Sequence, residues 1–403
     1  MISPQGALDI VLKTTRPLKM LSLPLADADG FCLAQDVRAD RNLPPTDRSA
    51  MDGYALRAAD VERFSGKLEL TGEAAAGQVF TSKIKPGKCV RIFTGAVVPS
   101  GIDTVVKVEH TQETGGVVTV LEPVASGDNI RRQGEETAKG QVVLTKGTIL
   151  GPIQVGLCAT LGKAVVKVYG RPRVAVISTG TEIVAPDQTA KSWQIRDANG
   201  PALCAALKTA GCGKAFYRIA QDNASALRKT LRSALKNRDV VLLSGGVSVG
   251  RYDLVPQVIQ EIGAKVRFHK VAIKPGKPVL YATFGRNQHI FGLPGNPLSA
   301  LTGLHEFVLP AIRRMAGVGE QDCHPSVYLP LAETLTPRGK RLEHVLVRIV
   351  QRETGPKLVP VLSRGSADLV AANLADGVVL LPRDKRKCLA GKYVEFRSWR
   401  QVP

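Results

Sequence analysis

A glycine-rich segment, Ser244-Gly245-Gly246-Val247-Ser248-Val249-Gly250, has the residue types of an anion-binding loop. It follows an apolar run at 239–243 and precedes a stretch with a helical pattern, which gives a strand, a turn and a helix start in succession. Glycines let backbone N–H groups face a ligand, and a helix start adds partial positive charge. The segment matches neither Gly-x-Gly-x-x-Gly nor the Walker pattern, so an oxyanion site and a plain tight connection are equally open.

Three carboxylates near this segment could take part in chemistry. Glu182 ends the segment Ser178-Thr179-Gly180-Thr181-Glu182, Asp222 precedes a predicted helix, and Asp253 follows the glycine-rich segment. Taken singly, Glu182 is as readily a solvated turn residue, and the two aspartates are as readily helix caps. Together, at equivalent ends of a parallel sheet beside an anion loop, they indicate a divalent cation or a ribose hydroxyl partner.

Two lysines lie on a short turn, Lys274-Pro275-Gly276-Lys277-Pro278, whose shape proline and glycine restrict. The turn is either a solvated surface turn or a clamp for a tetrahedral oxyanion. Downstream, the segment 292–299 starts a helix near Pro297 and could offer N–H groups and Ser299 to an anion. The six histidines lie in no nucleophile or zinc signature, which disfavours a covalent mechanism.

Strands and helices alternate along residues 171–316, which predicts a mostly parallel sheet covered on both faces. In such sheets ligands bind at the carboxyl ends of the strands, where the loops 178–182, 244–253 and 293–299 begin. Short β-like runs at 66–125 and again after 317 predict two smaller β-domains. The predicted domains are a discontinuous N-terminal linker domain (1–39 and 139–170), an inserted β-domain (40–138), a central α/β domain (171–316) and a C-terminal β-domain (317–403).

Composition narrows the function classes. A net charge of +20 over 403 residues fits nucleic-acid binding, an enzyme that attracts small anions, or a basic proteome that gives the charge no specific meaning. An aromatic content of 5% and the lack of a nucleic-acid-reading motif make nucleic acid the weaker choice. Seven scattered cysteines indicate free thiols in a reducing cytoplasm, and we expect neither a membrane span nor a signal peptide.

Seven motifs taken together resemble the molybdopterin molybdenumtransferase family, which also includes the E-domain of gephyrin. No motif is specific alone, but their order along most of the chain is. They are Ser49-Ala50-Met51-Asp52-Gly53-Tyr54-Ala55, Arg91-Ile92-Phe93-Thr94-Gly95-Ala96, Ser178-Thr179-Gly180-Thr181-Glu182, Asp197-Ala198-Asn199, the glycine-rich segment, the lysine turn and Leu293-Pro294-Gly295-Asn296-Pro297.

The resemblance implies a multidomain α/β plus β fold. It comprises a central three-layer α/β domain with a mostly parallel sheet of the molybdopterin-binding type, an inserted small β-domain and a C-terminal β-barrel-like domain. It also implies an elongated homodimer, joined through the discontinuous N-terminal domain, and contact with the molybdopterin adenylyltransferase. The implied reaction inserts molybdenum from molybdate into adenylylated molybdopterin, releases AMP and uses a divalent cation such as Mg²⁺.

The resemblance also implies residue roles. The catalytic set would be Asp52, Glu182, Asp222 and Asp253, with Asp222 and Asp253 holding the metal. The substrate-binding set would be Thr94, Ser244, Gly245, Gly246, Ser248, Gly250, Lys274, Lys277, Pro294, Asn296, Pro297, Ser299 and Ser366. Within it, Lys274, Lys277 and Ser299 would hold molybdate, and Ser248 would hold the adenylylated pterin. Asp52 and Thr94 would enter the site from the β-domain of the partner subunit.

Three positions depart from the family pattern. Thr181 stands where the family often has aspartate, Arg251 where it often has an acid, and Leu346 where it has an arginine. A non-catalytic scaffold with the same fold, a paralogue with an altered ligand and a nucleic-acid-binding protein are the competing hypotheses. Release of AMP in the presence of Mg²⁺ and molybdate would distinguish the enzyme from all three.

Overall fold

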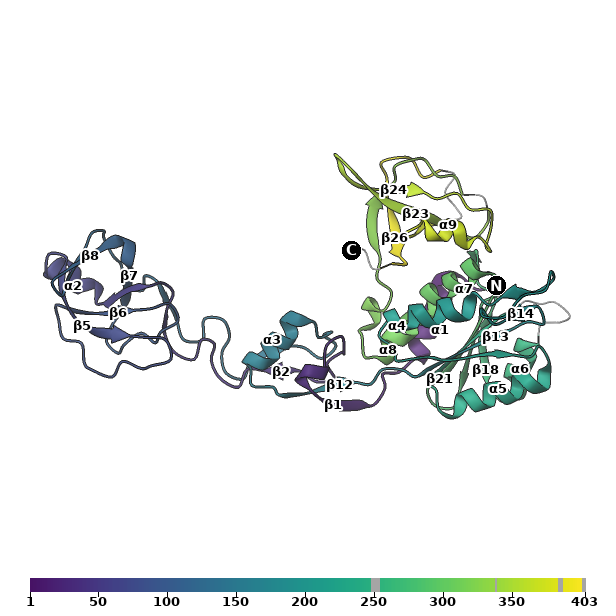
Figure 1. Ribbon diagram of the computed structural model, residues 1–403, viewed down its shortest axis with the longest axis horizontal. Helices are drawn as coiled ribbons and strands as arrows, with labels where there is room; N and C mark the ends of the chain where they lie inside the picture. The colour runs from purple at the N-terminus through teal and green to yellow at the C-terminus, as the bar shows by residue number, and fades with distance from the viewer. Residues whose placement is uncertain (248–253, 338, 383–386, 401–403) are drawn as a thin grey trace. The chain divides into compact units, whose positions relative to one another are not determined.

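A central parallel sheet organises the larger part of the chain (Figure 1). The computed structural model describes residues 1–247, 254–337, 339–382 and 387–400. These residues form two compact units, one with residues 1–34, 147–151 and 165–403 and one with residues 35–146 and 152–164. The predicted site residues Ser248, Gly250 and Asp253 lie outside the described residues, as does Arg251, and the predicted domain boundaries stay a prediction.

Six strands form the central sheet of the first unit. Their order is β16 (Phe216–Ala220), β13 (Val174–Thr179), β17 (Val240–Ser244), β21 (Gln288–Leu293), β20 (Leu280–Phe284) and β18 (Lys265–His269). The first four run parallel to one another, whereas β20 and β18 pair antiparallel. Every residue of β13 and β17 is buried. Their continuous apolar runs are explained by this burial, because both faces of the sheet are covered.

Helices cover the two faces of this sheet. On one face Val174 and Val176 of β13 share a core with α1 (Pro4–Thr14), α4 (Asn199–Thr209), α7 (Pro297–Gly303) and α8 (Leu309–Met315). On the other face Ala175 and Ile177 pack with α5 (Ala224–Lys236) and α6 (Val255–Glu261). Because successive strand side chains point to opposite faces, one strand serves both cores. The predicted three-layer α/β arrangement with a mostly parallel sheet is confirmed.

Two helical details refine the sequence analysis. The helix expected to start near Pro297 contains a π-helical segment, η3 (Leu304–Val308), between α7 and α8. At α5 the capping residue is Asn223, whose side chain accepts a hydrogen bond from the N–H of Ala226 at 2.8 Å. The interpretation of Asp222 as a helix cap is therefore wrong. None of the helices in the described part of the chain is both long and apolar enough to span a membrane.

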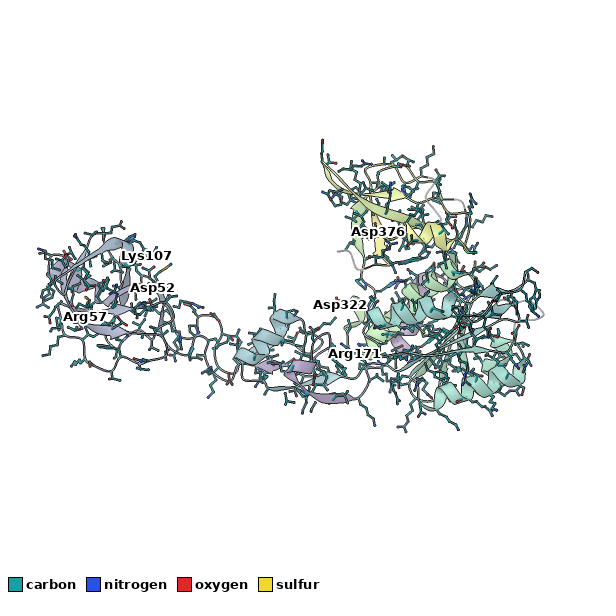
Figure 2. All side chains as sticks on the ribbon, in the orientation of Figure 1. Asp52, Arg57, Lys107, Arg171, Asp322 and Asp376 are labelled. Carbon is teal, nitrogen blue, oxygen red and sulfur yellow. The ribbon has the colours of Figure 1, made fainter. Side chains whose placement is uncertain are left out.

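The second unit is rich in strands, and Figure 2 labels Asp52, Arg57 and Lys107 within it. Its sheet has the order β7 (Thr104–Lys107), β4 (Gly53–Leu56), β6 (Lys88–Ile92), β5 (Lys67–Ala74), β9 (Val117–Val120) and β8 (Thr111–Thr114). The shorter elements are α2 (Ala58–Arg63), α3 (Pro152–Thr160), β2 (Val37–Arg38) paired with β11 (Val142–Leu144), and β3 (Arg48–Ser49) paired with β10 (Ile130–Arg131). The β-like runs expected between 66 and 125 all lie in the six-stranded sheet.

A second sheet in the first unit is built largely from C-terminal residues. Its strands are β19 (Ile273–Lys274), β23 (Leu342–Arg352), β25 (Gly377–Leu381), β26 (Tyr393–Ser398) and β22 (Val327–Pro330), with β24 (Gly355–Pro360) on β23 and α9 (Leu369–Asn373) nearby. The unit also contains two ribbons, β1 (Met20–Pro24) with β12 (Val165–Tyr169) and β14 (Ile183–Val184) with β15 (Ile195–Arg196). The strand-rich C-terminal region is as predicted. Its edge strand β19, however, comes from the middle of the chain.

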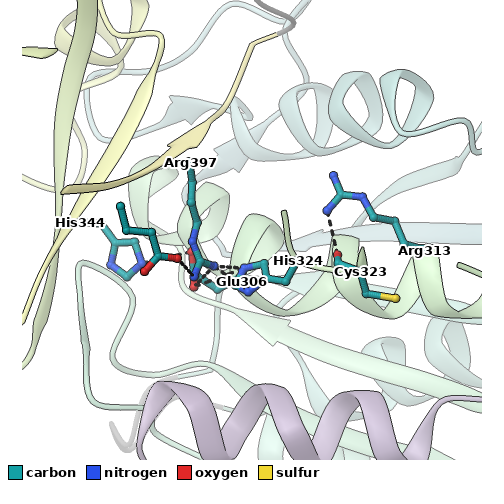
Figure 3. Close-up of polar contacts among 7 residues, drawn as sticks. Glu306, Arg313, Cys323, His324, His344 and Arg397 are labelled. Carbon is teal, nitrogen blue, oxygen red and sulfur yellow. Dashed lines mark hydrogen bonds and ion pairs between the residues drawn. The ribbon is translucent and has the colours of Figure 1, made fainter. Parts of the chain in front are cut away.

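A buried charged cluster joins the C-terminal strands to η3 (Figure 3). Glu306 of η3 is 4% exposed, and its Oε2 accepts a hydrogen bond from Nη1 of Arg397 at 2.9 Å. Nε2 of His344 lies 3.3 Å from Glu306 Oε1, and Nε2 of His324 lies 3.6 Å from Oε2. Burial alone would raise the pKa of Glu306, but His344, Arg397 and His324 lower it to about 2. Glu306 is therefore a buried carboxylate.

Candidate functional site

Three loops begin side by side at one edge of the central sheet. Strand β13 ends at Thr179, β17 at Ser244 and β21 at Leu293. Ser178 pairs in register with Ser244, and Ser244 pairs with Leu293. These parallel strands therefore end at the same level. The structure thus brings together the three segments that the sequence analysis placed at the carboxyl ends of the strands.

Gly245 fits where no other residue would. Its φ is +96°, and a Cβ built on it would lie 2.2 Å from the carbonyl oxygen of Thr179. A Cβ built on Gly295 would lie 3.8 Å from Gly245 Cα. The N–H of Gly245 donates to the carbonyl of Leu293 at 3.1 Å. Gly245 therefore lets three loops approach closely, and its N–H is engaged within the protein.

Asn199 ties two of these loops together at the start of α4. Its Nδ2 donates to Ser244 Oγ at 2.8 Å and to the carbonyl of Gly295 at 2.6 Å. Ser244 is buried, so this hydroxyl has a structural partner. Asn199 belongs to one of the family motifs but was missing from the predicted site residues. The signal that could have revealed it is a side-chain amide placed at a helix start beside a strand edge.

The Asp197 side chain holds the start of α4 in place. Its Oδ1 accepts from the N–H of Gly200 at 3.0 Å, and its Oδ2 accepts from the hydroxyl of Tyr217 at 2.7 Å. Burial and then the hydrogen bond to Asp197 raise the pKa of the Tyr217 hydroxyl, so it remains a donor at neutral pH. A Cβ on Gly200 would lie 2.1 Å from the Tyr217 ring. This close packing holds α4 against β16.

The predicted carboxylates behave differently from one another. The hydroxyl of Thr179 donates to Asp222 Oδ1 at 3.2 Å, which places the half-buried Asp222 carboxylate beside the end of β13. Glu182 is exposed, and its Oε2 would lie 2.8 Å from a Cβ built on Gly180, so this carboxylate turns back over its own loop. Among the described residues, no three His, Cys, Asp or Glu side chains gather as metal ligands do.

The lysine turn approaches the first turn of α7. A Cβ on Gly276 would lie 3.3 Å from the carbonyl oxygen of Ser299, and its φ is +106°. Lys274 Nζ donates to Glu343 Oε1 at 2.9 Å, whereas Lys277 in the same turn is exposed. Ser299 is 5% exposed. Glu343 was not found from the sequence, because it lies 69 residues from Lys274, on strand β23, and only the pairing of β19 with β23 brings the two residues together.

Ser366 connects the C-terminal region to the loop before α7. Its Oγ accepts from Asn296 Nδ2 at 2.8 Å, and its carbonyl accepts from the N–H of Leu298 at 2.9 Å. Pro294 is buried, and Pro297 occupies the first turn of α7 as predicted. Leu346, where the resemblance implies an arginine, is 6% exposed in an apolar cluster with Leu298. An apolar side chain there packs on α7 and offers no charge to an anion.

Asp52 and Thr94 lie in the second unit and contact each other. Asp52 Oδ1 accepts from the backbone N–H of Thr94 at 2.6 Å and from its hydroxyl at 2.7 Å. These two hydrogen bonds, the backbone one first, lower the pKa of Asp52. Gly53 pairs with Lys107 on the neighbouring strand, and the N–H of Val108 donates to the carbonyl of Asp52 at 3.1 Å. The sequence analysis correctly paired these two residues in one place.

Family models cover almost the whole chain. The "MoeA N-terminal region (domain I and II)" matches residues 2–162, the "Probable molybdopterin binding domain" matches residues 175–314, and the "MoeA C-terminal region (domain IV)" matches residues 328–399. A curated molybdopterin molybdenumtransferase of Staphylococcus aureus (strain MRSA252) is 32% identical over 400 residues, which are 98% of this chain and 95% of the relative. The chain belongs to the molybdopterin molybdenumtransferase family. The predicted membership and the predicted enzyme class, a transferase, are both confirmed.

Other relatives agree with this assignment. A molybdopterin molybdenumtransferase of Staphylococcus epidermidis is 31% identical and covers 98% of this chain and 94% of its own length. A solved MoeA protein of molybdopterin biosynthesis from Pyrococcus horikoshii has a TM-score of 0.81 at 31% identity, with all of both chains covered. A second Pyrococcus horikoshii MoeA structure has a TM-score of 0.84 at 28% identity and covers 99% of this chain and 100% of its own. The multidomain fold class is thereby confirmed over the whole chain.

Proposed function

We propose that this family member inserts molybdenum from molybdate into adenylylated molybdopterin and releases AMP in a Mg²⁺-dependent reaction. The match to curated molybdopterin molybdenumtransferases over 98% of the chain carries this proposal. The juxtaposition of the glycine-rich turn, Asp222 and the lysine turn at neighbouring strand ends supports it. A phosphate-containing substrate and an oxyanion must be held close together, and the two kinds of loop offer partners of the right chemistry for each.

The adenylylated pterin would lie over the glycine-rich turn. Ser244 and Gly245 shape the start of this turn, and Gly246, with φ of +61°, continues it. Ser248 and Gly250 would extend the cradle. Glycine has no Cβ, so Gly245 and Gly246 would not obstruct a ligand. Phosphate oxygens would then approach the backbone N–H groups of the turn. The role of this turn is to bind and orient the diphosphate bond before it is cleaved.

The acidic residues fit a Mg²⁺ ion in their donor chemistry. The Asp222 carboxylate and the Thr179 hydroxyl beside it are oxygen donors, as Mg²⁺ prefers, and Mg²⁺ takes few protein ligands when phosphates and waters complete its shell. Asp222 and Asp253 would hold the ion, with Glu182 as a further carboxylate at the loop end. When bound, Mg²⁺ would neutralise charge on the phosphates of the bond that is cleaved. Asp222 would be oriented by the hydrogen bond from the Thr179 hydroxyl.

Molybdate would bind between the lysine turn and the start of α7. Lys274 and Lys277 supply positive charge, and Ser299, Asn296 and Ser366 add polar groups around the same place. Pro294 and Pro297 stiffen the loop that carries them. Because molybdate and the substrate phosphates repel each other, the lysine ammonium groups lower the free energy of holding both. The dithiolene of the pterin binds the metal, so no cysteine cluster of the protein is required.

The remaining predictions concern assembly. A homodimer, with Asp52 and Thr94 contributing to the partner subunit's site, would place an ionised carboxylate and a hydroxyl near the substrate. The adenylyltransferase would hand over its adenylylated product to this enzyme. The predicted linker, inserted β, α/β and C-terminal β-domains, with boundaries at 39, 139, 171 and 317, and the cytoplasmic location complete this proposal. Sedimentation equilibrium of the purified chain would test the dimer.

Reconstitution tests the proposed activity. Purified protein with Mg²⁺, molybdate and adenylylated molybdopterin should release AMP and yield a cofactor that activates an apo-molybdoenzyme. Omission of molybdate gives the matched control, because AMP release should then fall. A protein that binds adenylylated molybdopterin but releases no AMP under these conditions would contradict the transferase proposal and favour a scaffold.

A further inference from the structure

An ion pair joins the lysine turn to a side chain of the C-terminal sheet. Lys274 Nζ lies 2.9 Å from Glu343 Oε1, and the side chain of Glu343 is 7% exposed while that of Lys274 is 42% exposed. Lys277, three residues further along the same turn, is exposed. The two lysines of the turn therefore differ, because one has a fixed, nearly buried anionic partner.

Backbone pairing fixes where this partner lies. Strands β19 and β23 are parallel, and Lys274 is in register with Glu343. The N–H of Leu342 donates to the carbonyl of Ala272 at 3.1 Å, and Nη1 of Arg341 donates to the carbonyl of Ile273 at 3.0 Å. Glu343 is also in register with Leu381 of β25, so its backbone is held between two paired strands. A change of the Lys274 rotamer would leave Glu343 where it is.

A lysine side chain loses rotamer freedom when it binds an anion, and this loss of entropy opposes binding. An ammonium group has three donors, so Lys274 can keep the bond to Glu343 and still donate to an oxyanion. The carboxylate also opposes a dianion by its charge, which limits the gain. Glu343 is nearly buried and fixed before the ligand binds. It therefore orders the Lys274 side chain in advance, and less conformational entropy is lost on binding.

We propose that Glu343 is a positioning residue that holds the Lys274 ammonium group toward a tetrahedral oxyanion bound between the lysine turn and α7. The inference rests on the proposed function, since it names the group that orders one of the molybdate ligands. It also gives the C-terminal region a defined part in the site. Ser366 holds the loop before α7 through Asn296 and Leu298, and Glu343 holds the opposing lysine.

Calorimetric titration of the full chain with molybdate tests the positioning role. The variants are Glu343→Met, which keeps the volume and removes the acceptor, Lys274→Met, and the double variant. Glu343→Met should weaken molybdate binding about tenfold, and it should have no further effect in the Lys274→Met protein, because contacting residues couple and independent ones add. An unchanged affinity of Glu343→Met, or an equal loss in the Lys274→Met background, would overturn the proposal.

The conservative variant Glu343→Gln separates position from charge. Its amide oxygen can still accept from Lys274, so it should recover most of the affinity that Glu343→Met loses, and a loss as large as that of Lys274→Met would overturn the proposal. This variant also keeps the test decisive where Glu343→Met fails to fold. In turnover, Glu343→Met should raise the KM for molybdate more than it lowers kcat. A wild-type protein that binds no molybdate would instead contradict the proposed function.

Discussion

The sheet edge around Asn199 and the cluster around Glu306 are both polar, but they are built in different ways. At the sheet edge, neutral hydrogen bonds of 2.6 and 2.8 Å join Asn199 to loops that directly follow strands. In the cluster, a carboxylate meets Arg397, His324 and His344 from three separate segments, and Glu306 is 4% exposed (Figure 3).

Because of this difference, polar groups at the sheet edge can bind a ligand, whereas those of the cluster around Glu306 are committed to one another. Loops at a sheet edge can bind a ligand because their polar groups border solvent, as the exposed Glu182 and the half-buried Asp222 do. A buried ion pair has already lost its water, so removing one partner leaves an uncompensated charge. We therefore expect changes at Glu306 to act on stability and changes at Asp222 to act on turnover.

The largest expected effect is a loss of folding stability at low pH, when histidines with a lowered pKa become protonated. Burial lowers the pKa of His289, His305 and His324 to about 4. Because these groups bind a proton more readily when unfolded, their stabilising effect is present above about pH 6.5 and is lost as the pH falls toward 4. Each contributes about 1.4 kcal/mol per pH unit within that window. Urea unfolding at pH 7, 6 and 5 measures the slope.

A His324→Gln variant is the control for this slope. It removes one titrating group from the cluster, so the dependence of the unfolding free energy on pH should fall by about 1.4 kcal/mol per pH unit. Glu306 should add to the acid loss only at lower pH, because its stabilising effect is lost between about 4.5 and 2. A flat profile from pH 7 to 5 would contradict the lowered pKa of these histidines.

Removal of the Arg397 guanidinium should produce the next largest effect. Arg397→Met leaves the Glu306 carboxylate buried beside His324 and His344, and breaking a buried pair in this way costs about 3–5 kcal/mol. The free energy of unfolding from urea titration measures the loss. The matched control is Glu306→Leu with Arg397→Met, which removes both charges and should recover much of it. Equal stabilities of the single and double variants would show that the pair is not coupled.

Sequence reasoning was successful where the polar residues follow their own secondary structure. The loops that begin after Ser178, Ser244 and Leu293 come directly after strands that continuous apolar runs reveal, so their common edge could be predicted. Glu306 is a single acid among the helical residues 304–308, and nothing in the neighbouring sequence indicates a charged partner. The partner of Glu306 at Arg397 lies 91 residues away, and no local pattern pairs them. Glu343 was missed for the same reason.

Gly245→Ala tests whether the sheet edge depends on close backbone approach. The added Cβ would lie 2.2 Å from the Thr179 carbonyl oxygen at a φ of +96°, so the loop must shift, at a cost of about 1–3 kcal/mol. Gly263→Ala is the matched control, because Gly263 has a φ of +87° and no atom within 4 Å of its built Cβ. Thermal unfolding should show a larger loss for Gly245→Ala, and AMP release should fall with it. Equal losses would mean that backbone strain alone matters.

The smallest effect on stability should come from the residue with the largest proposed role in turnover. Asp222→Asn keeps an oxygen that can accept from the Thr179 hydroxyl, and the side chain is only half buried, so the free energy of unfolding should change by less than about 0.5 kcal/mol. AMP release should nevertheless fall, since an amide is a weaker Mg²⁺ ligand than a carboxylate. Raising the Mg²⁺ concentration should restore part of the rate. A wild-type rate with unchanged Mg²⁺ dependence would remove Asp222 from the metal site and leave Thr179–Asp222 as a structural contact between two loops.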